Sequence, residues 1–231
     1  MHIMGLQKMT LLDYPGKVAC TVFFGGCNFR CPYCHNAGLV LGNDSEPVIE
    51  EKEFFSFLSH RQGLLDGVCI TGGEPMVQKD LETFIIHIRD LGFQVKLDTN
   101  GSFPKQLKSL LDNHLLDYIS MDIKNSREHY GATIGIQDYD TKPIEQSVSL
   151  LMNQTIPYEF RTTVVKEYHT LEDIKKIGSW LAGCRAYYLQ AFKDSGNLIG
   201  EGVMTAFEKS SMEEMIELLR PEIPAVSLRG I

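Results

Sequence analysis

Six short apolar runs alternate with segments of helical spacing along this chain. The runs occupy residues 18–24, 67–71, 93–98, 118–123, 158–165 and 186–192. Apolar residues recur every three or four positions at residues 50–59, 79–91, 105–111, 144–152, 171–181 and 211–219. Short β-branched runs are typical of buried strands, and the longer spacing is typical of amphipathic helices. The alternation therefore predicts an α/β fold whose strands are mainly parallel and joined by right-handed crossovers.

The length of the chain narrows the choice between a doubly wound sheet and a barrel. A complete eight-fold barrel takes about 250 residues, whereas this sequence has 231 residues for its six strand and helix units. We therefore predict a partial (β/α)6 TIM-like barrel that is laterally open. No low-complexity run or Pro/Ser-rich linker marks a boundary, so we expect a single domain over residues 1–231. Its core is expected at about residues 17–192, with a C-terminal packing segment at about 200–231.

Polar motifs follow the first four predicted strands. A cysteine loop follows the first, residues 71–75 (Thr-Gly-Gly-Glu-Pro) the second, residues 98–101 (Asp-Thr-Asn-Gly) the third, and residues 122–124 (Asp-Ile-Lys) close the fourth. In parallel α/β folds the chemistry lies at the carboxyl ends of the strands. Taken singly, the last three fit ordinary turns or a surface ion pair equally well. Four such motifs at successive strand ends predict one functional rim.

The cysteine loop holds Cys27, Cys31 and Cys34 within a dozen residues. Three thiolates at these spacings can hold three irons of a four-iron cluster, which leaves the fourth iron with an open position. Cys31 and Cys34 alone also fit the pair of thiols that proteins use for thiol–disulfide exchange. Residues 31–35 also fit the C-x-x-C-H pattern to which c-type haem is attached. A structural zinc site needs four closed ligands, and His35 is the only near candidate for the fourth. The third cysteine upstream of the dithiol favours the cluster.

Composition excludes several classes of partner. The chain has 22 basic and 30 acidic residues and a formal net charge of −8, which argues against binding to a nucleic-acid backbone. The N-terminal residues lack a charged segment leading into an apolar stretch, and no run of about 18 apolar residues occurs. We therefore expect a soluble cytoplasmic protein with no membrane partner, whose cysteines are ligands or core residues rather than disulfides.

The motifs together resemble those of radical S-adenosylmethionine (SAM) enzymes. The pattern C-x-x-x-C-x-aromatic-C at residues 27–34 and Gly-Gly-Glu-Pro at residues 72–75 carry this resemblance. Within that superfamily the chain resembles the small activating enzymes of glycyl radical proteins, above all those of anaerobic ribonucleoside-triphosphate reductase. Supporting runs lie at residues 5–8, 12–17, 34–36 and 121–124, and the resemblance extends from about residue 3 to about residue 192.

The resemblance implies a [4Fe-4S] cluster held by Cys27, Cys31 and Cys34, with SAM chelated to the open iron through its methionine amino and carboxylate groups. It also implies cofactor-binding residues around the rim: Tyr33, His35, Gly72, Gly73, Glu74, Asp98, Asn100, Asp122, Lys124, Arg161 and Gln190. The two glycines would let the backbone come close to the cofactor, and Glu74 would accept a hydrogen bond from its ammonium group. Tyr33 would pack near the adenine or, equally, be a core aromatic beneath the loop.

The remaining assignments concern the ribose and the carboxylate. Asp98, Asn100, Asp122 and Lys124 are candidates for the ribose hydroxyls and the methionine carboxylate, and the Asp-x-Lys pair does this work in related pyruvate formate-lyase activating enzymes. Arg161 could join them, pair with Glu159 or face solvent. Gln190 stands about where those relatives carry a histidine, and this departure argues against membership of that subgroup.

Other cysteines and histidines are expected to be structural. Cys20 and Cys69 fall within apolar strand runs, where a small inert buried thiol is the ordinary explanation. Cys184 follows a glycine at a helix end and could be exposed. Of the seven histidines we expect only His35 to adjoin the site, through a backbone contact with the cofactor rather than as a metal ligand.

By resemblance, the reduced cluster donates one electron to SAM, and the resulting 5′-deoxyadenosyl radical removes a hydrogen atom from a glycine α-carbon of the partner, anaerobic ribonucleotide reductase. A flavodoxin or a ferredoxin-type protein would donate the electron. Two other enzyme functions remain open: activation of another glycyl radical enzyme of the pyruvate formate-lyase type, and radical modification of a metabolite. A non-catalytic metal-binding or redox-sensing module is the alternative outside enzymes.

Overall fold

Strands and helices alternate along almost the whole chain in the computed structural model, which describes residues 1–42, 48–194 and 196–230. The strands are β1 (Ile3–Thr10), β2 (Ala19–Phe24), β3 (Gly67–Gly72), β4 (Gln94–Thr99), β5 (Tyr118–Asp122), β6 (Tyr158–Val164), β7 (Tyr187–Ala191) and β8 (Val226–Arg229). The helices are α1 (Ala37–Leu41), α2 (Glu51–Ser59), the 3-10 helix η1 (Pro75–Val77), α3 (Leu81–Asp90), α4 (Pro104–Asp112), α5 (Tyr130–Ile134), α6 (Lys142–Met152), α7 (Leu171–Trp180) and α8 (Lys209–Leu219).

The strands follow one another in the sheet in sequence order, from β1 at one end to β8 at the other. Contacts divide the chain into two compact units. The first comprises Met1–Asn28, Asn36–Thr99 and Lys105–Ser120, and the second Phe29–His35, Asn100–Pro104 and Met121–Ile231. An α/β fold with mainly parallel strands and an unclosed strand order is thus confirmed. The organisation as one domain stays a prediction.

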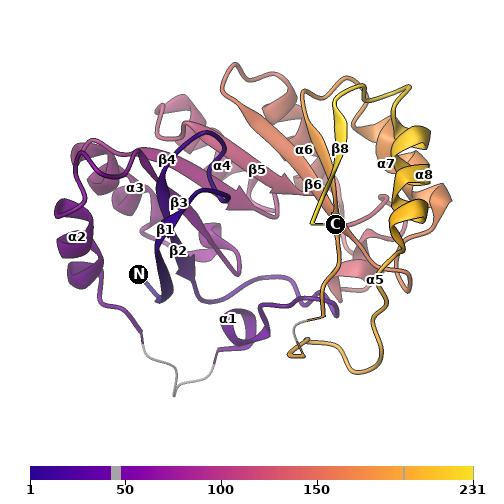
Figure 1. Ribbon diagram of the computed structural model, residues 1–231, viewed down its shortest axis with the longest axis horizontal. Coiled ribbons are helices and arrows are strands. Elements are labelled where there is room, and N and C mark those ends of the chain that lie inside the picture. Colours follow the sequence, from indigo (N-terminus) through magenta and orange to yellow (C-terminus); the bar gives the residue numbers. More distant parts are fainter. Residues whose placement is uncertain (43–47, 195, 231) are drawn as a thin grey trace. The chain divides into compact units, whose positions relative to one another are not determined.

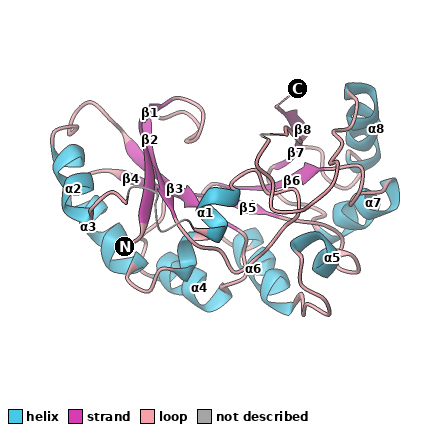
Figure 2. Ribbon diagram, turned by 90° about the horizontal axis from the view of Figure 1, so that it is seen from below, coloured by secondary structure: helices cyan, strands magenta, loops and turns pink. Residues whose placement is uncertain are grey.

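The first unit is built on β1 to β4. β1 pairs antiparallel with β2, whereas β2 with β3 and β3 with β4 are parallel pairs. Helices α2 and α3 lie side by side next to these strands (Figure 2). Phe54 of α2 stacks on Phe84 of α3 at a ring-centroid distance of 5.1 Å, and Phe84 meets Phe24 of β2 edge-on at 5.3 Å. These buried rings join both helices to the strand that leads into the cysteine loop.

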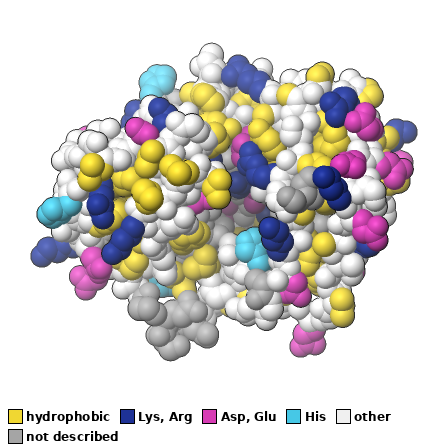
Figure 3. Space-filling model, viewed as in Figure 1, with side chains coloured by type: hydrophobic (Ala, Val, Ile, Leu, Met, Phe, Trp, Pro, Cys, Tyr) yellow, Lys and Arg dark blue, Asp and Glu magenta, His cyan; other side chains and the backbone are white. Residues whose placement is uncertain are grey.

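The second unit carries the parallel pairs β6–β7 and β7–β8. Helices α7 and α8 lie against one another beside these strands (Figure 1). The N-terminus of α7 is fixed by a capping box, in which Thr170 and Asp173 bond each other's backbone N–H groups. Acidic side chains gather along the edge that carries α8 (Figure 3), where Glu213, Glu214 and Glu217 are exposed.

All six predicted strand runs are strands in the structure, as β2 to β7, and all six predicted helical segments are helices. The six predicted strands did not include β1 or β8. Residues 3–10 contain Gly, Gln and Lys, and β1 exposes residues 7–9, so it lacks the apolar run of a buried strand. We expected the apolar run at residues 223–228 to be a packing segment, and residues 226–229 form strand β8, which pairs parallel with β7. Ile231 lies outside the described residues. In the part of the chain described, no helix is long and apolar enough to cross a membrane.

Arg229 of strand β8 forms an ion pair with a buried carboxylate, and removing this pair tests how much β8 contributes to stability. Arg229 donates to both carboxylate oxygens of Glu159 on β6, at 2.7 and 3.0 Å, and the Glu159 side chain is 1% exposed. We expect Arg229→Ala to lower the free energy of unfolding by about 2 kcal/mol, because a buried carboxylate loses two charge-assisted hydrogen bonds. Urea unfolding measures this change.

The matched control is Arg220→Ala on the surface of the same unit. Arg220 donates to Glu217 at 2.9 Å, but the two side chains are 53% and 69% exposed. An exposed pair of this kind is expected to change the unfolding free energy by less than about 0.5 kcal/mol. Equal effects of the two substitutions would contradict a stabilising role for β8.

Candidate functional site

The cysteine loop leaves β2 and passes from one unit to the other. Cys27 belongs to the first unit, and Cys31 and Cys34 belong to the second. Cys34 N–H donates to the Cys31 carbonyl at 3.0 Å, which closes a tight turn between these two thiols. None of the six cysteines, all of which lie in the described ranges, is in a disulfide bond. Within the described ranges no group of three or more His, Cys, Asp or Glu side chains is placed to hold one metal ion. The assignment of the three thiols as cluster ligands thus rests on their spacing and chemistry.

Gly72 and Gly73 at the end of β3 lie against the backbone that leads into this loop. Gly73 N–H donates to the Phe24 carbonyl at 2.9 Å. A Cβ added at Gly73 would lie 2.0 Å from the Gly26 carbonyl oxygen, and one at Gly72 would lie 2.2 Å from the Phe24 carbonyl oxygen. Gly72 also has a φ of +129°, which only glycine adopts readily. The two glycines are therefore required by the approach of β3 to the strand and loop that carry Cys27.

Glu74 follows these glycines and is fully buried. Its Oε1 accepts hydrogen bonds from Met76 N–H at 3.1 Å and from the Thr99 hydroxyl at 3.0 Å. The carboxylate thus links the start of η1 to the end of β4. We predicted a hydrogen bond from the cofactor's ammonium group to Glu74, and that role stays a prediction alongside these two bonds.

The two predicted site residues at the end of β4, Asp98 and Asn100, belong to different units. Asp98 on β4 forms an ion pair with Lys96, whose side chain is 2% exposed. Lys96 Nζ also lies 3.7 Å from Cys69 Sγ. Asn100 is buried, and its Oδ1 accepts from Ser102 N–H at 2.9 Å and from the Ser102 hydroxyl at 2.6 Å. The Asn100 side chain therefore shapes its own turn.

Asp122, Lys124 and Arg161 form an ion triad at the ends of β5 and β6. Lys124 Nζ lies 2.9 Å from Asp122 Oδ2, while Arg161 Nε and Nη2 lie 3.0 and 2.9 Å from Oδ1. Burial alone would raise the pKa of Asp122, but the charges of Lys124 and Arg161 hold it far below its usual range. Burial would lower the pKa of Lys124, and Asp122 raises it well above its ordinary value. Two cations face one carboxylate, so these three groups carry a net charge of +1.

Tyr33 lies between the last two cysteines in sequence and is buried, with its ring 5.7 Å from that of Tyr168. Its hydroxyl has no hydrogen-bond partner within the residues that the structure describes. Two other predicted residues are less enclosed. His35 is exposed, and Gln190 is half-buried in β7, paired in register with Thr163 of β6 and Arg229 of β8.

Our expectation that only His35 among the histidines adjoins the site is wrong. His169, in the turn after β6, lies with Nε2 2.8 Å from the Lys124 carbonyl oxygen and with its ring 6.2 Å from that of Tyr33. The sequence carried a signal for it, because His169 follows the fifth predicted strand and so stands at the carboxyl-end rim. Lys96 was missed as well; it shares one face of β4 with Asp98, two residues on.

The cysteines outside the loop are buried. Burial raises the pKa of Cys20 to about 12 and that of Cys184 to about 11. Cys184 is 5% exposed, so the expectation that it could be exposed is wrong. Thiols with such values are not nucleophiles near neutral pH, which agrees with the inert role expected for Cys20.

Comparison with known proteins places this chain in a family. Residues 21–181 match the radical SAM superfamily. A protein of Methanocaldococcus jannaschii that is provisionally named a glycyl-radical enzyme activating enzyme is 32% identical over 196 residues, which cover 83% of this chain and 80% of that protein. A probable GTP 3′,8-cyclase of Thermococcus kodakarensis is 29% identical over 143 residues, 61% of this chain and 45% of the cyclase.

A solved structure shares the fold. The crystal structure of Streptococcus suis SuiB bound to its precursor peptide SuiA superposes with a TM-score of 0.70 at 12% identity, covering 91% of this chain and 48% of SuiB. Enzymes of the matched superfamily use a [4Fe-4S] cluster and SAM. The family match over most of the chain, together with the activating-enzyme relative, shows that this protein belongs to the radical SAM superfamily.

Proposed function

We propose that this enzyme generates a glycyl radical on a partner protein and that the partner is anaerobic ribonucleoside-triphosphate reductase. The observation that carries the proposal is the three-cysteine loop at the end of β2, in a chain that aligns over 83% of its length with an activating-enzyme relative. The supporting runs at residues 5–8 and 12–17 and Gln190, in place of the histidine of pyruvate formate-lyase activators, favour the reductase over that other partner.

The residues present suit the cluster and SAM. Cys27, Cys31 and Cys34 would hold three irons of the cluster through their thiolates. Lys124 and Arg161 would bind the methionine carboxylate, because the triad with Asp122 has one positive charge in excess of its negative charge. The buried Tyr33 hydroxyl, which has no partner in the described part of the chain, would face a polar group of the bound cofactor.

Remaining rim residues would complete the binding site. We assign the ribose hydroxyls to Asp98 and Asn100, and the ammonium group of SAM to Glu74 with the backbone of Gly72 and Gly73. His35 would contact the cofactor through its backbone, and Gln190 lies on the sheet face next to Arg229 in register. These assignments follow the strand ends on which the residues stand.

When bound, the cluster would supply one electron that breaks a carbon–sulfur bond of SAM and releases methionine. The 5′-deoxyadenosyl group would then take a hydrogen atom from a glycine α-carbon and become 5′-deoxyadenosine. The protein's own contribution is to hold these groups in register and to exclude water and oxygen. A flavodoxin or a ferredoxin-type protein would supply the electron. We propose that the enzyme works in the cytoplasm under anaerobic conditions.

Electron paramagnetic resonance (EPR) tests the proposed partner. The cluster is rebuilt under anaerobic conditions, reduced with dithionite and mixed with SAM and the reductase of the same organism. We expect the doublet signal of a glycyl radical, whose intensity follows the amount of reductase and which is absent without SAM. A pyruvate formate-lyase type enzyme is the comparison partner. Radical formation on that enzyme alone would contradict the proposed partner.

A further inference from the structure

The turn between β6 and α7 encloses a histidine whose two ring nitrogens both contact backbone. His169 is 2% exposed. Its Nδ1 lies 3.1 Å from Val165 N, which can only donate, and its Nε2 lies 2.8 Å from the Lys124 carbonyl oxygen, which can only accept. Nε2 therefore carries a proton, whereas Nδ1 also lies 3.2 Å from the Val165 carbonyl oxygen and so faces both a donor and an acceptor. Burial also lowers the pKa of His169.

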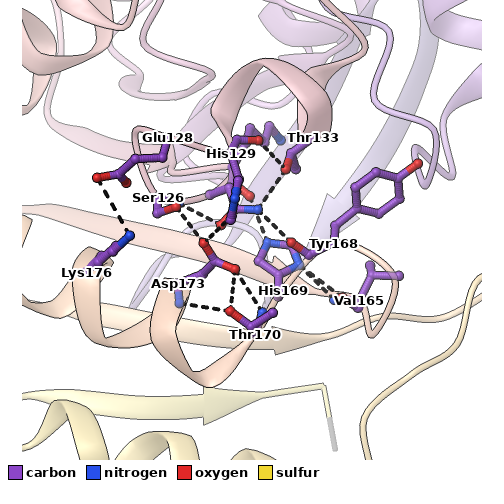
Figure 4. A network of polar contacts seen from close by, with 12 residues as sticks. Ser126, Glu128, His129, Thr133, Val165, Tyr168, His169, Thr170, Asp173 and Lys176 are labelled. Atoms are coloured by element: carbon purple, nitrogen blue, oxygen red, sulfur yellow. Dashed lines mark hydrogen bonds and ion pairs between the residues drawn. The ribbon is translucent and has the colours of Figure 1, made fainter.

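Further bonds tie the same turn to the segment after Lys124 (Figure 4). Asn125 Nδ2 donates to the Tyr168 carbonyl at 2.7 Å, and the Ser126 hydroxyl donates to Asp173 Oδ1 at 2.6 Å. Asn125, Ser126 and Asp173 are each at most 1% exposed. Buried polar groups that are all satisfied make a rigid connection. Residues 124–126 are thus bonded at three successive positions to the β6–α7 turn and the first turn of α7, through the Lys124 carbonyl and the Asn125 and Ser126 side chains.

The turn also reaches the cysteine loop. The rings of Tyr168 and His169 lie 5.7 and 6.2 Å from the Tyr33 ring, and the His169 ring meets it edge-on. Tyr33 precedes Cys34 in the chain. One turn therefore touches both the strand end that carries Lys124 and the loop that carries two of the three thiols.

We propose that His169 is a positioning residue for SAM, which holds the backbone of Lys124 at a fixed place relative to Tyr33 by donating Nε2–H to the Lys124 carbonyl. The proposal rests on the assignment of Lys124 and Tyr33 to SAM under the proposed function, and it is independent of the partner protein. His169 itself contacts neither the cluster nor the substrate. Without the hydrogen bond from His169, the backbone of Lys124 shifts. The Lys124 side chain then no longer lies in its place for SAM, and the affinity for SAM falls.

Two conservative substitutions separate the two hydrogen bonds. In His169→Gln the side-chain amide nitrogen replaces Nε2 and keeps the donor to Lys124. In His169→Asn the side-chain oxygen replaces Nδ1, keeps the acceptor for Val165 and cannot reach Lys124. We expect His169→Asn to raise the Kd for SAM by about tenfold and His169→Gln to raise it by less than about threefold. Equilibrium dialysis of radiolabelled SAM against the anaerobic, cluster-loaded protein measures both values.

Tyr187→Phe is the control for a general loss of stability. The buried Tyr187 hydroxyl donates to Thr162 Oγ1 at 2.7 Å in the same unit, so its loss lowers the melting temperature but leaves the Kd for SAM unchanged. Iron content and the EPR spectrum of the reduced cluster without SAM should be equal in all four proteins. On adding SAM, the spectrum should change less in His169→Asn than in the wild type at the same concentration.

Two results would overturn the inference. In one, His169→Asn behaves like Tyr187→Phe, with a lower melting temperature and wild-type affinity for SAM. In the other, both His169 variants lose affinity equally, which would show that the bond to Lys124 is not the cause. A wild-type enzyme that binds SAM yet forms no radical on the reductase would instead contradict the proposed partner and leave this inference intact.

Discussion

Replacing Cys31 with alanine is expected to lower SAM cleavage by more than about 100-fold, because an iron–sulfur cluster that loses one of three thiolate ligands is not retained. Iron and sulfide should fall together after anaerobic reconstitution, and 5′-deoxyadenosine should no longer form with dithionite as the reductant. The same result is expected for Cys27→Ala and Cys34→Ala. Iron analysis and chromatography of 5′-deoxyadenosine measure the two effects.

Cys184→Ala is the matched control for this experiment. Cys184 is a buried free thiol outside the loop, and burial raises its pKa to about 11. Its replacement should leave iron content and SAM cleavage within about twofold of the wild type, with only a stability change typical of a small core substitution. Full iron content and cleavage in Cys31→Ala would rule out the ligand assignment. A zinc site that survives in its place would favour the structural metal site.

Gly73→Ala is expected to destabilise the first unit strongly, although it adds only one methyl group. The added Cβ would lie 2.0 Å from the Gly26 carbonyl oxygen and 3.2 Å from the Cys27 Cβ. No side-chain rotation relieves a clash between Cβ and backbone, so β3 or the start of the cysteine loop must move. We expect a loss of about 3 kcal/mol in unfolding free energy. Cluster content and SAM affinity should fall as well, because the displaced backbone carries Cys27.

Gly63→Ala separates this clash from the general cost of replacing a glycine. Gly63 has a φ of +74°, and a Cβ built there meets nothing within 4 Å. Its replacement should cost about 1 kcal/mol of backbone strain and leave the cluster and SAM binding unchanged. Denaturant unfolding, iron analysis and SAM dialysis compare the two variants. If Gly73→Ala were no worse than Gly63→Ala in all three, the close approach would not matter for the site.

The elements that could be predicted from sequence are those with a strong local signal. β3 reads Gly-Val-Cys-Ile-Thr-Gly and has four buried residues in succession, so its apolar run marks it as a strand. β8 has only four residues, one of them buried, and its Arg229 bonds Glu159 of β6, seventy positions away. Ion pairs between distant segments leave no periodic pattern in the sequence, so β8 could not be found that way.

In the candidate site, too, the features with a local sequence signal could be predicted and the contacts between distant residues could not. Cysteine spacing and the strand-end motifs predicted which residues stand at the rim, because motif chemistry is local. The partners of those residues are not local. Glu74 bonds Thr99, and Lys124 is held through its carbonyl by His169, 45 positions later. His169 follows a predicted strand, but the sequence does not show which distant strand end its ring contacts.

Transfer of deuterium tests the central claim most directly. The reductase is produced with glycine deuterated at the α-carbon and is incubated under anaerobic conditions with the reduced enzyme and SAM. Our account predicts 5′-deoxyadenosine that carries one deuterium, in an amount equal to the glycyl radical found by EPR, since the hydrogen atom comes from the glycine α-carbon. Mass spectrometry of the product reads this out. Product without deuterium, formed at the same rate whether or not the reductase is present, would contradict the account.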